Sequence, residues 1–224
     1  MHIHSIKSAA QWCAGLLLCA WLTGCATQTA PKDQSAFIAA NPASILVLPP
    51  VNESPEVQAS DSVLSHATRP LAESGYYVMP VTLVKETFRQ NGMEIPDEIH
   101  EIPQARLREI FGADAALYIK INRYGTVYQV IDSATVVTAE ARLVDLRSGN
   151  VLWTGSASAS NKEGNNTSSS GLAGILISAL VNQVLNTATD ASHGIAATAT
   201  QRLLSAGGSD GLLFGPRSPR RLQK

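Results

Sequence analysis

One cysteine of this sequence stands where a defined covalent chemistry is expected. Cys25 directly follows the small residues Thr23 and Gly24. A basic residue, Lys7, and an apolar run over residues 14–22 come earlier, which is the layout of a secretory signal with a cleavage site. The apolar run is too short to span a bilayer. A cysteine thiolate is the side-chain nucleophile that can be alkylated to a stable thioether, so we expect modification and cleavage at Cys25.

The four residues Leu22-Thr23-Gly24-Cys25 resemble the lipobox of bacterial lipoproteins. The resemblance implies that Cys25 becomes the first mature residue and carries a diacylglyceryl thioether and an N-acyl chain such as palmitate. Several acyl chains together anchor a protein firmly, at ~0.8 kcal/mol per buried CH2. Ala26 stands where an Asp retains lipoproteins in the inner membrane in enterobacterial-type sorting. The expectation is therefore an outer-membrane location facing the periplasm, with cell-surface exposure as the alternative.

Composition sets limits on the mature protein. Removal of 24 of the 224 residues leaves 200, which suits one domain with its own core. Loss of Lys7 leaves 16 basic against 18 acidic residues, a net charge of −2, which argues against nucleic acid as a partner. Cys13 and Cys19 leave with the signal, so Cys25 has no partner for an internal disulfide. We expect packing alone to hold the core.

The chain divides into four predicted parts. These are a signal peptide over 1–24, a lipidated N-terminus and tether over 25–42, a periplasmic α/β domain over 43–205, and a flexible tail over 206–224. The tether is predicted because its Thr, Gln, Ala, Pro and Lys residues show little apolar pattern.

The first half of the predicted domain alternates strands with helices. Strands are expected at 45–48, 76–80 and 114–121, and helices are expected to begin at Asp61, Thr82 and Pro103. Pro70 should kink or restart the first helix. The acidic stretch 93–101 is predicted to be a loop. This alternation is typical of an α/β fold.

In the second half the apolar period changes to two. Residues 124–131, 137–143 and 151–155, with a turn at 147–150, predict an antiparallel extension of the sheet. A Ser, Asn and Gly-rich loop is expected at 156–171, followed by helices at 172–185 and 195–204. The predicted fold is α/β (α+β): a mixed sheet flanked by helices, with an antiparallel hairpin extension and C-terminal helices.

The predicted helix at 172–185 has apolar residues in nearly every direction and is shorter than the ~20 residues of a membrane span. Two outcomes can satisfy such a surface: a deep slot in the same domain or contact with another copy. We expect the second, a homo-oligomer with Leu176, Leu180 and Val184 at its interface.

The remaining residue patterns predict no catalytic site, no metal site and no cofactor. We find no phosphate-binding Gly-rich loop and no Gly-x-Ser-x-Gly turn. His66, His100 and His193 are scattered, so each is interpreted as a surface or cap histidine rather than a ligand. The acids within 97–101 are interpreted as a solvated loop. The basic residues within 217–224 are interpreted as a disordered end, with contact to anionic lipid as the alternative.

Several short segments together resemble a family of bacterial outer-membrane lipoproteins that includes a neisserial lipoprotein studied as a vaccine antigen. They are Asn41–Pro50, Leu71–Pro80, Gly112-Ala113-Asp114, Asp145–Trp153 and Leu212–Pro216. Gly112-Ala113-Asp114 and the turn before Trp153 are also similar to the periplasmic α/β domains of the curli secretion lipoprotein and of the Tol-system beta-propeller protein. The resemblance implies a lipid-anchored domain that joins an envelope assembly, and it supplies no catalytic residues.

The leading hypothesis for function is a non-enzymatic component of an envelope assembly, secretion or transport complex. Its expected partners are the bilayer, further copies of itself, and other envelope lipoproteins or channel components. An activator of peptidoglycan synthesis is the second hypothesis, and co-purified partners would separate the two. A periplasmic hydrolase is the third, and it requires an acid–base pair placed in a pocket.

Overall fold

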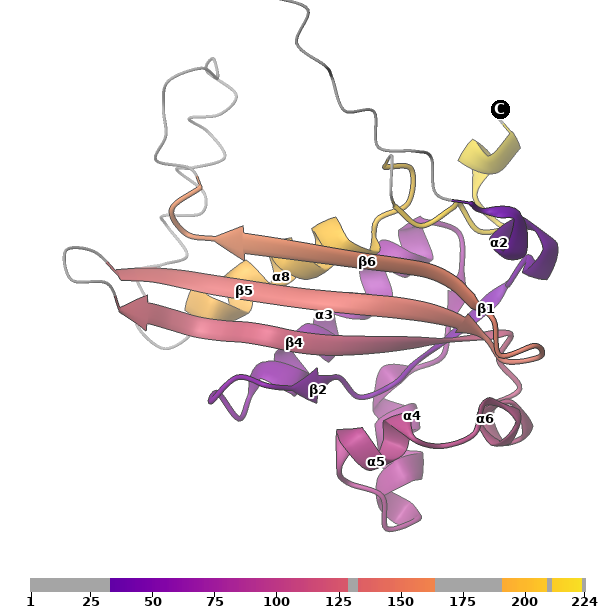
Figure 1. The fold of residues 1–224 in the computed structure, drawn as a ribbon, viewed down its shortest axis with the longest axis horizontal. Helices are drawn as coiled ribbons and strands as arrows, with labels where there is room; N and C mark the ends of the chain where they lie inside the picture. Colours follow the sequence, from indigo (N-terminus) through magenta and orange to yellow (C-terminus); the bar gives the residue numbers. More distant parts are fainter. Residues whose placement is uncertain (1–32, 129–132, 164–190, 209–210, 223–224) are drawn as a thin grey trace, which may run out of the picture. The chain divides into compact units, whose positions relative to one another are not determined.

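A single open sheet organises the part of the chain that the computed structural model describes, residues 33–128, 133–163, 191–208 and 211–222 (Figure 1). The strand order is β3-β1-β4-β5-β6, and β2 pairs with the later part of β4. The strands are β1 (Ser44–Val47), β2 (Val51–Asn52), β3 (Tyr77–Val78), β4 (Ala115–Tyr128), β5 (Ser133–Asp145) and β6 (Val151–Ser160). β1 is parallel to β3 and β4, whereas β4, β5 and β6 are antiparallel. The predicted mixed α/β fold with an antiparallel extension is confirmed.

The interior strand β1 is built from a short apolar run. Ile45, Leu46 and Val47 have no exposed surface, because parallel strands covered on both faces place every side chain in a core. β4 alternates instead: Leu117 and Ile119 point into one core, and Tyr118 points into the other.

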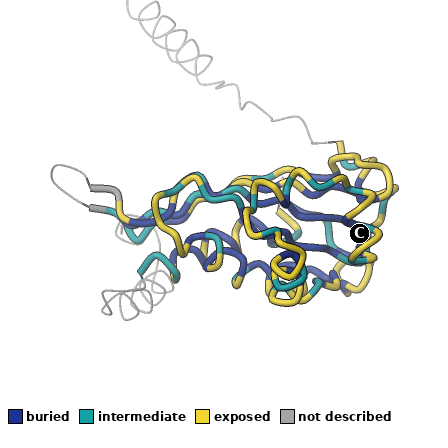
Figure 2. Tube along the Cα trace, turned by 90° about the horizontal axis from the view of Figure 1, so that it is seen from below, coloured by how far each residue is buried: buried dark blue, intermediate teal, exposed yellow. Residues whose placement is uncertain are grey.

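The helices divide between the two faces of the sheet. They are α2 (Ser35–Ala40), α3 (Ala59–Glu73), α4 (Val81–Gln90), α5 (Pro96–His100), α6 (Gln104–Phe111), α8 (Ala191–Leu204) and the 3-10 helix η1 (Pro219–Leu222). α3 and α8 pack on one face and share the larger core, to which α2 adds Phe37. α4, α5 and α6 cover the other face at the end where β1 lies. Figure 2 shows the buried residues along the strands and the inner sides of the helices.

Several local predictions are corrected by the structure. α3 begins at Ala59 after Gln58, so Asp61 lies in its first turn instead of capping it, and α3 continues past Pro70 to Glu73. The predicted acidic loop contains α5, which Pro96 starts. The predicted Ser-rich loop is ordered strand as far as Ser160.

Two further predictions fail at the ends of the domain. The predicted tether contains α2, whose Phe37 is 4% exposed. In the predicted flexible tail, the described residues form backbone hydrogen bonds with the domain and bury Leu212. Within the described residues, no helix combines the length and the apolar content needed to cross a membrane.

Candidate functional site

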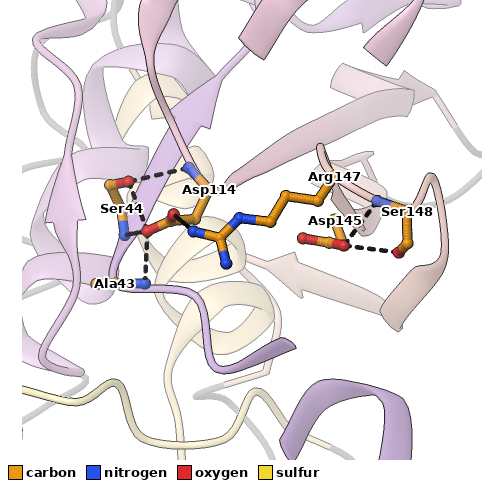
Figure 3. A network of polar contacts seen from close by, with 6 residues as sticks. All are labelled: Ala43, Ser44, Asp114, Asp145, Arg147 and Ser148. Atoms are coloured by element: carbon orange, nitrogen blue, oxygen red, sulfur yellow. Dashed lines mark hydrogen bonds and ion pairs between the residues drawn. The ribbon is translucent and has the colours of Figure 1, made fainter. Parts of the chain in front are cut away.

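The chain enters the sheet at Ala43 and Ser44, and a single carboxylate holds this entry. Asp114 directly precedes β4, which runs parallel to β1, so its side chain lies beside the start of β1. Oδ2 of Asp114 accepts hydrogen bonds from the backbone N–H groups of Ala43 at 3.0 Å and Ser44 at 3.1 Å. The Ser44 hydroxyl donates to the same oxygen at 3.0 Å and accepts from the Asp114 N–H at 3.0 Å (Figure 3).

The turn between β5 and β6 completes this network. Nη2 of Arg147 donates to Oδ1 of Asp114 at 3.0 Å. Asp145 holds the turn by accepting from the N–H and the hydroxyl of Ser148, at 2.9 and 2.6 Å. The polar network therefore joins the entry of the tether, the start of β4 and the β5–β6 turn (Figure 3).

Two opposing effects act on the Asp114 carboxyl. Partial burial raises its pKa, but the hydrogen bonds from Ala43 and Ser44 and the nearby Arg147 charge lower it by more. The net pKa of Asp114 lies below its usual value, so the carboxylate is ionised at physiological pH. An ionised acceptor is the form that satisfies both backbone donors and the guanidinium.

The C-terminal segment reaches the same end of the sheet. We call its described residues, 205–208 and 211–222, the C-terminal clasp. Gly215 N–H donates to Ser74 O at 2.9 Å, and Arg217 N–H donates to Gly75 O at 3.2 Å. The Tyr76 hydroxyl donates to the Leu213 carbonyl, and burial raises the pKa of Tyr76, partly offset by the Arg221 charge. The clasp thus holds the loop between α3 and β3.

Glycine is required where the clasp crosses this loop. Gly75 has φ +94°, and a Cβ there would lie 2.4 Å from the backbone nitrogen of Ser218. A Cβ at Gly215 would lie 2.5 Å from the Gly75 carbonyl oxygen. The two backbones therefore approach more closely than side chains permit.

Two of the histidines predicted to be scattered lie together. The rings of His66 on α3 and His193 on α8 are 4.3 Å apart between centroids. Nδ1 of His193 lies 2.8 Å from the hydroxyl of Ser62, and Tyr124 donates to that hydroxyl at 2.9 Å. The prediction that the histidines are scattered is wrong for this pair, because α3 and α8 pack side by side.

The Ser62–His193 contact has the residue types of a nucleophile and a base. Ser62, however, is 7% exposed and lies within the contact between α3 and α8. Its hydroxyl is occupied by Tyr124 and His193, so a substrate could reach it only if the helices separated. The contact is better described as a polar link between two helices and the sheet.

His100 is also more buried than the sequence indicated. Its Nε2 lies 2.9 Å from the Pro49 carbonyl, and its ring meets Tyr118 edge-on at 5.1 Å. Arg142 covers the Tyr118 ring at 4.3 Å. Burial, with a smaller effect of the Arg142 charge, holds the pKa of His100 below its usual value despite the Pro49 hydrogen bond and the acids Asp97 and Glu101. Burial also raises the pKa of Tyr118.

The other predicted site residues are not brought together. Cys25, Leu176, Leu180 and Val184 lie outside the described residues. Asp97 and Glu98 are exposed in the first turn of α5, and no group of three metal-binding side chains occurs among the described residues.

The Asp114 network was missed by sequence reasoning. Ser44 is 70 residues away and Arg147 is 33 residues away, and neither shows a recognisable spacing. One usable signal is Gly112, which ends α6 at φ +65° and places Asp114 immediately before a strand.

The fold and its entry site define a class: a mixed α/β domain whose first and last described segments are fixed at one end of the sheet. Residues 32–217 match the family described as "Putative lipoprotein GNA1162-like", and the chain belongs to this family. It is 49% identical over 204 residues to the "Putative lipoprotein NMB1124/NMB1162" of Neisseria meningitidis serogroup B, covering 91% of this chain and 94% of the relative.

One solved structure agrees with this assignment. The crystal structure of lipoprotein GNA1162 from Neisseria meningitidis is 54% identical, with a TM-score of 0.52 over 65% of this chain and 100% of the other. A PelC dodecamer from Paraburkholderia phytofirmans is 16% identical, with a TM-score of 0.40 over 72% of this chain and 86% of the other. The PelC structure is too distant from this chain to bear on its function.

Proposed function

We propose that this chain is anchored through acylated Cys25 in the inner leaflet of the outer membrane and faces the periplasm. There it serves as a non-enzymatic component of an envelope assembly, secretion or transport complex. The observation that carries the proposal is the run Leu22-Thr23-Gly24-Cys25 in a member of a lipoprotein family. The thiol of Cys25 is the group that forms the thioether.

Metabolic labelling with a radioactive fatty acid tests the anchor. The wild-type protein should incorporate the label, and Cys25→Ser should lose it and accumulate as an uncleaved or soluble form. Cys13→Ser and Cys19→Ser are matched controls, because both remove a thiol that lies before the cleavage site. Label retained by Cys25→Ser would overturn the assignment.

The non-enzymatic role is supported by the way the polar side chains are used. Asp114 and Arg147 fix strand ends, and Ser62 links two helices to the sheet. Photo-crosslinking residues at Val57 and Val151, which are 95% and 49% exposed, should capture envelope proteins in living cells. Hydrolysis of peptidoglycan or phospholipid by the pure protein, abolished in Ser62→Ala, would favour a hydrolase instead.

Self-association is part of the proposal. The segment 172–185 carries the apolar side chains expected at an interface between copies, as argued from the sequence. Sedimentation of the unlipidated wild-type domain (Ala26 onward) at micromolar concentration should detect at least dimers, and Leu176→Asp or Leu180→Asp should weaken them. Asn182→Asp is the matched control, since it adds the same charge at a polar position. A monomeric wild-type protein would contradict this part.

A further inference from the structure

Three arginines of the C-terminal clasp form no ion pair with a carboxylate of the described residues. Arg217 and Arg220 are exposed and Arg221 is half-buried. No ion pair joins any of the three to an acidic residue in the described part of the chain. Residues 211–224 contain four basic residues and no acidic one. We call Arg217, Arg220 and Arg221 the arginine patch.

Five other arginines of the domain behave differently. Arg69, Arg89, Arg106, Arg147 and Arg202 each meet a carboxylate at 3.0 Å or less. In those pairs the charge is already matched inside the molecule. An external anion gains more from the arginine patch, where no described carboxylate competes for the guanidinium groups.

The clasp fixes the position of the patch. Arg217 is held through its backbone by Gly75, and its Nη1 lies 3.5 Å from the Ala43 carbonyl, at the entry of the tether. Arg220 lies over the Phe214 ring at 5.9 Å. In Figure 1 η1 lies beside α2, so the patch and the described start of the chain share one end of the domain.

The acids at this end have partners of their own. Asp33 accepts a hydrogen bond from the Ser35 N–H, and Glu73 pairs with Arg69. Asp114 and Asp145 are engaged in the polar network around Arg147. Counted together, these four acids, their partners Arg69 and Arg147, and the arginine patch carry five positive and four negative charges, so the surplus near the entry is one positive charge.

We propose that the arginine patch docks on the anionic phospholipid headgroups of the membrane that holds the anchor. Guanidinium groups match phosphate oxygens with paired hydrogen bonds. The inference rests on acylation of Cys25. Cys25 and Asp33 are eight residues apart, so the chain between them spans at most about 28 Å. A tether of this length keeps the patch at an effective concentration on the order of millimolar, which lets a weak contact persist.

Docking also orients the domain. β4 begins directly after Asp114, at the end of the domain that carries the patch. It runs for 14 residues, about 43 Å at the usual rise of a strand. Headgroup attraction is lost within about 10 Å of solution at ordinary ionic strength. Contact through the patch therefore holds the far ends of β4 and β5 away from the bilayer, where they can meet partners.

Energy transfer to a headgroup-labelled lipid tests the proposal. The acylated protein carries a fluorophore on Pro219→Cys, an exposed position beside the patch, and is reconstituted in vesicles. Vesicles of phosphatidylcholine alone are compared with vesicles containing about one third phosphatidylglycerol. Transfer should rise at least about two-fold with phosphatidylglycerol and return to the lower value in high salt.

Matched variants identify the residues responsible. The triple variant R217Q/R220Q/R221Q should lose the rise, whereas R89Q/R106Q/R123Q, which removes the same charge elsewhere, should keep it. A fluorophore on Thr126→Cys, near the far end of β4, should show no dependence on lipid composition. Unchanged melting of the triple variant excludes misfolding.

Other outcomes overturn the proposal. Equal transfer in both vesicles, or a rise retained by the triple variant, excludes docking through the patch. Binding of millimolar inorganic phosphate that depends on the three arginines, with no rise in transfer on phosphatidylglycerol vesicles, means that the arginines bind free phosphate rather than a membrane. Mass spectrometry of the protein shows independently whether Cys25 is acylated. If Cys25 carries no lipid, the proposed anchor is wrong. The fluorophore-labelled protein, mixed with vesicles, then still shows whether the arginine patch binds them.

Discussion

Asp114 joins segments that are far apart in the sequence, and its removal should be costly. Asp114→Ala leaves the N–H groups of Ala43 and Ser44 without their acceptor and frees Arg147. Hydrogen bonds to a charged group are worth about 1.5–3 kcal/mol each, and water can replace part of this loss. We expect the free energy of unfolding to fall by about 2–3 kcal/mol, measured by urea denaturation.

Glu98→Ala is the control for Asp114→Ala. It also removes one carboxylate, but from an exposed position in the first turn of α5. Its urea midpoint should stay close to that of the wild type. Equal midpoints for Asp114→Ala and Glu98→Ala would show that the network does not stabilise the fold.

His100 should make stability depend on pH. Its folded-state pKa is lowered from 6.5 chiefly by burial, so the unfolded chain binds the proton more readily. Stability is therefore full above pH 6.5, and it falls as the pH drops through 6.5 toward the folded-state value. His100→Gln should remove this part of the loss. The difference between its urea midpoint and that of the wild type should change between pH 7.5 and pH 5 (about 2.5 units apart), and a constant difference would contradict the expectation.

At the scale of elements, a substitution that adds one methyl group tests whether the C-terminal clasp depends on its close approach to Gly75. Gly75→Ala strains a positive φ and drives a Cβ into the backbone of Ser218. Gly92→Ala is the matched control, because Gly92 has φ +77° but nothing within 4 Å of an added Cβ. Both substitutions should cost about 1 kcal/mol for the backbone conformation. Gly75→Ala should lower the free energy of unfolding further, because the added Cβ must also displace the clasp.

Limited digestion with trypsin separates the two glycine variants. In the wild type the clasp holds Arg217 against Gly75. Cleavage after Arg217, Arg220 and Arg221 should be faster in Gly75→Ala than in Gly92→Ala or the wild type. Similar rates in all three proteins would mean that the clasp does not depend on the close approach at Gly75.

Sequence patterns predicted the regular elements where the apolar period was strong. The buried run of β1, the alternation of β4 and β5, and the turn before Trp153 were read correctly, and Trp153 is 8% exposed. Gly112 ends α6 in the left-handed conformation that glycine adopts readily. Ile110 is 47% exposed, because α6 is short and only its Leu107 face meets the sheet.

The polar sites could not be predicted in the same way. Ser62 and His193 are 131 residues apart, and the contact of Asp114 with Ser44 spans 70 residues. These hydrogen bonds form only when two particular elements become neighbours in the fold. The apolar period within one element does not show which other element will lie beside it. The short strand β2 has two residues, too few for any period to be recognised, whereas β3, also of two residues, lies inside the strand predicted at 76–80.

At the scale of the whole domain, the boundaries matter for stability. A chain limited to residues 43–205 lacks Phe37 and Leu212, which are 4% and 1% exposed in the intact domain. Loss of a buried Phe costs about 3–5 kcal/mol and loss of a buried Leu about 2–5 kcal/mol. A chain of residues 33–222 should therefore melt on the order of 10–20 °C higher, measured by circular dichroism. Equal melting temperatures would mean that the domain is complete without its two end segments.

The entry of the tether at Ser44 has a mechanical consequence. β1 is an interior strand with a neighbour on each side, and its hydrogen bonds run across the strand direction. A pull along the strand from the anchored end would load those bonds in shear, all at once, whereas an edge strand would peel away one bond at a time. α2 has Phe37 as its one buried side chain, so it would detach at a lower force than β1. Its detachment would lengthen the tether before the hydrogen bonds of β1 broke.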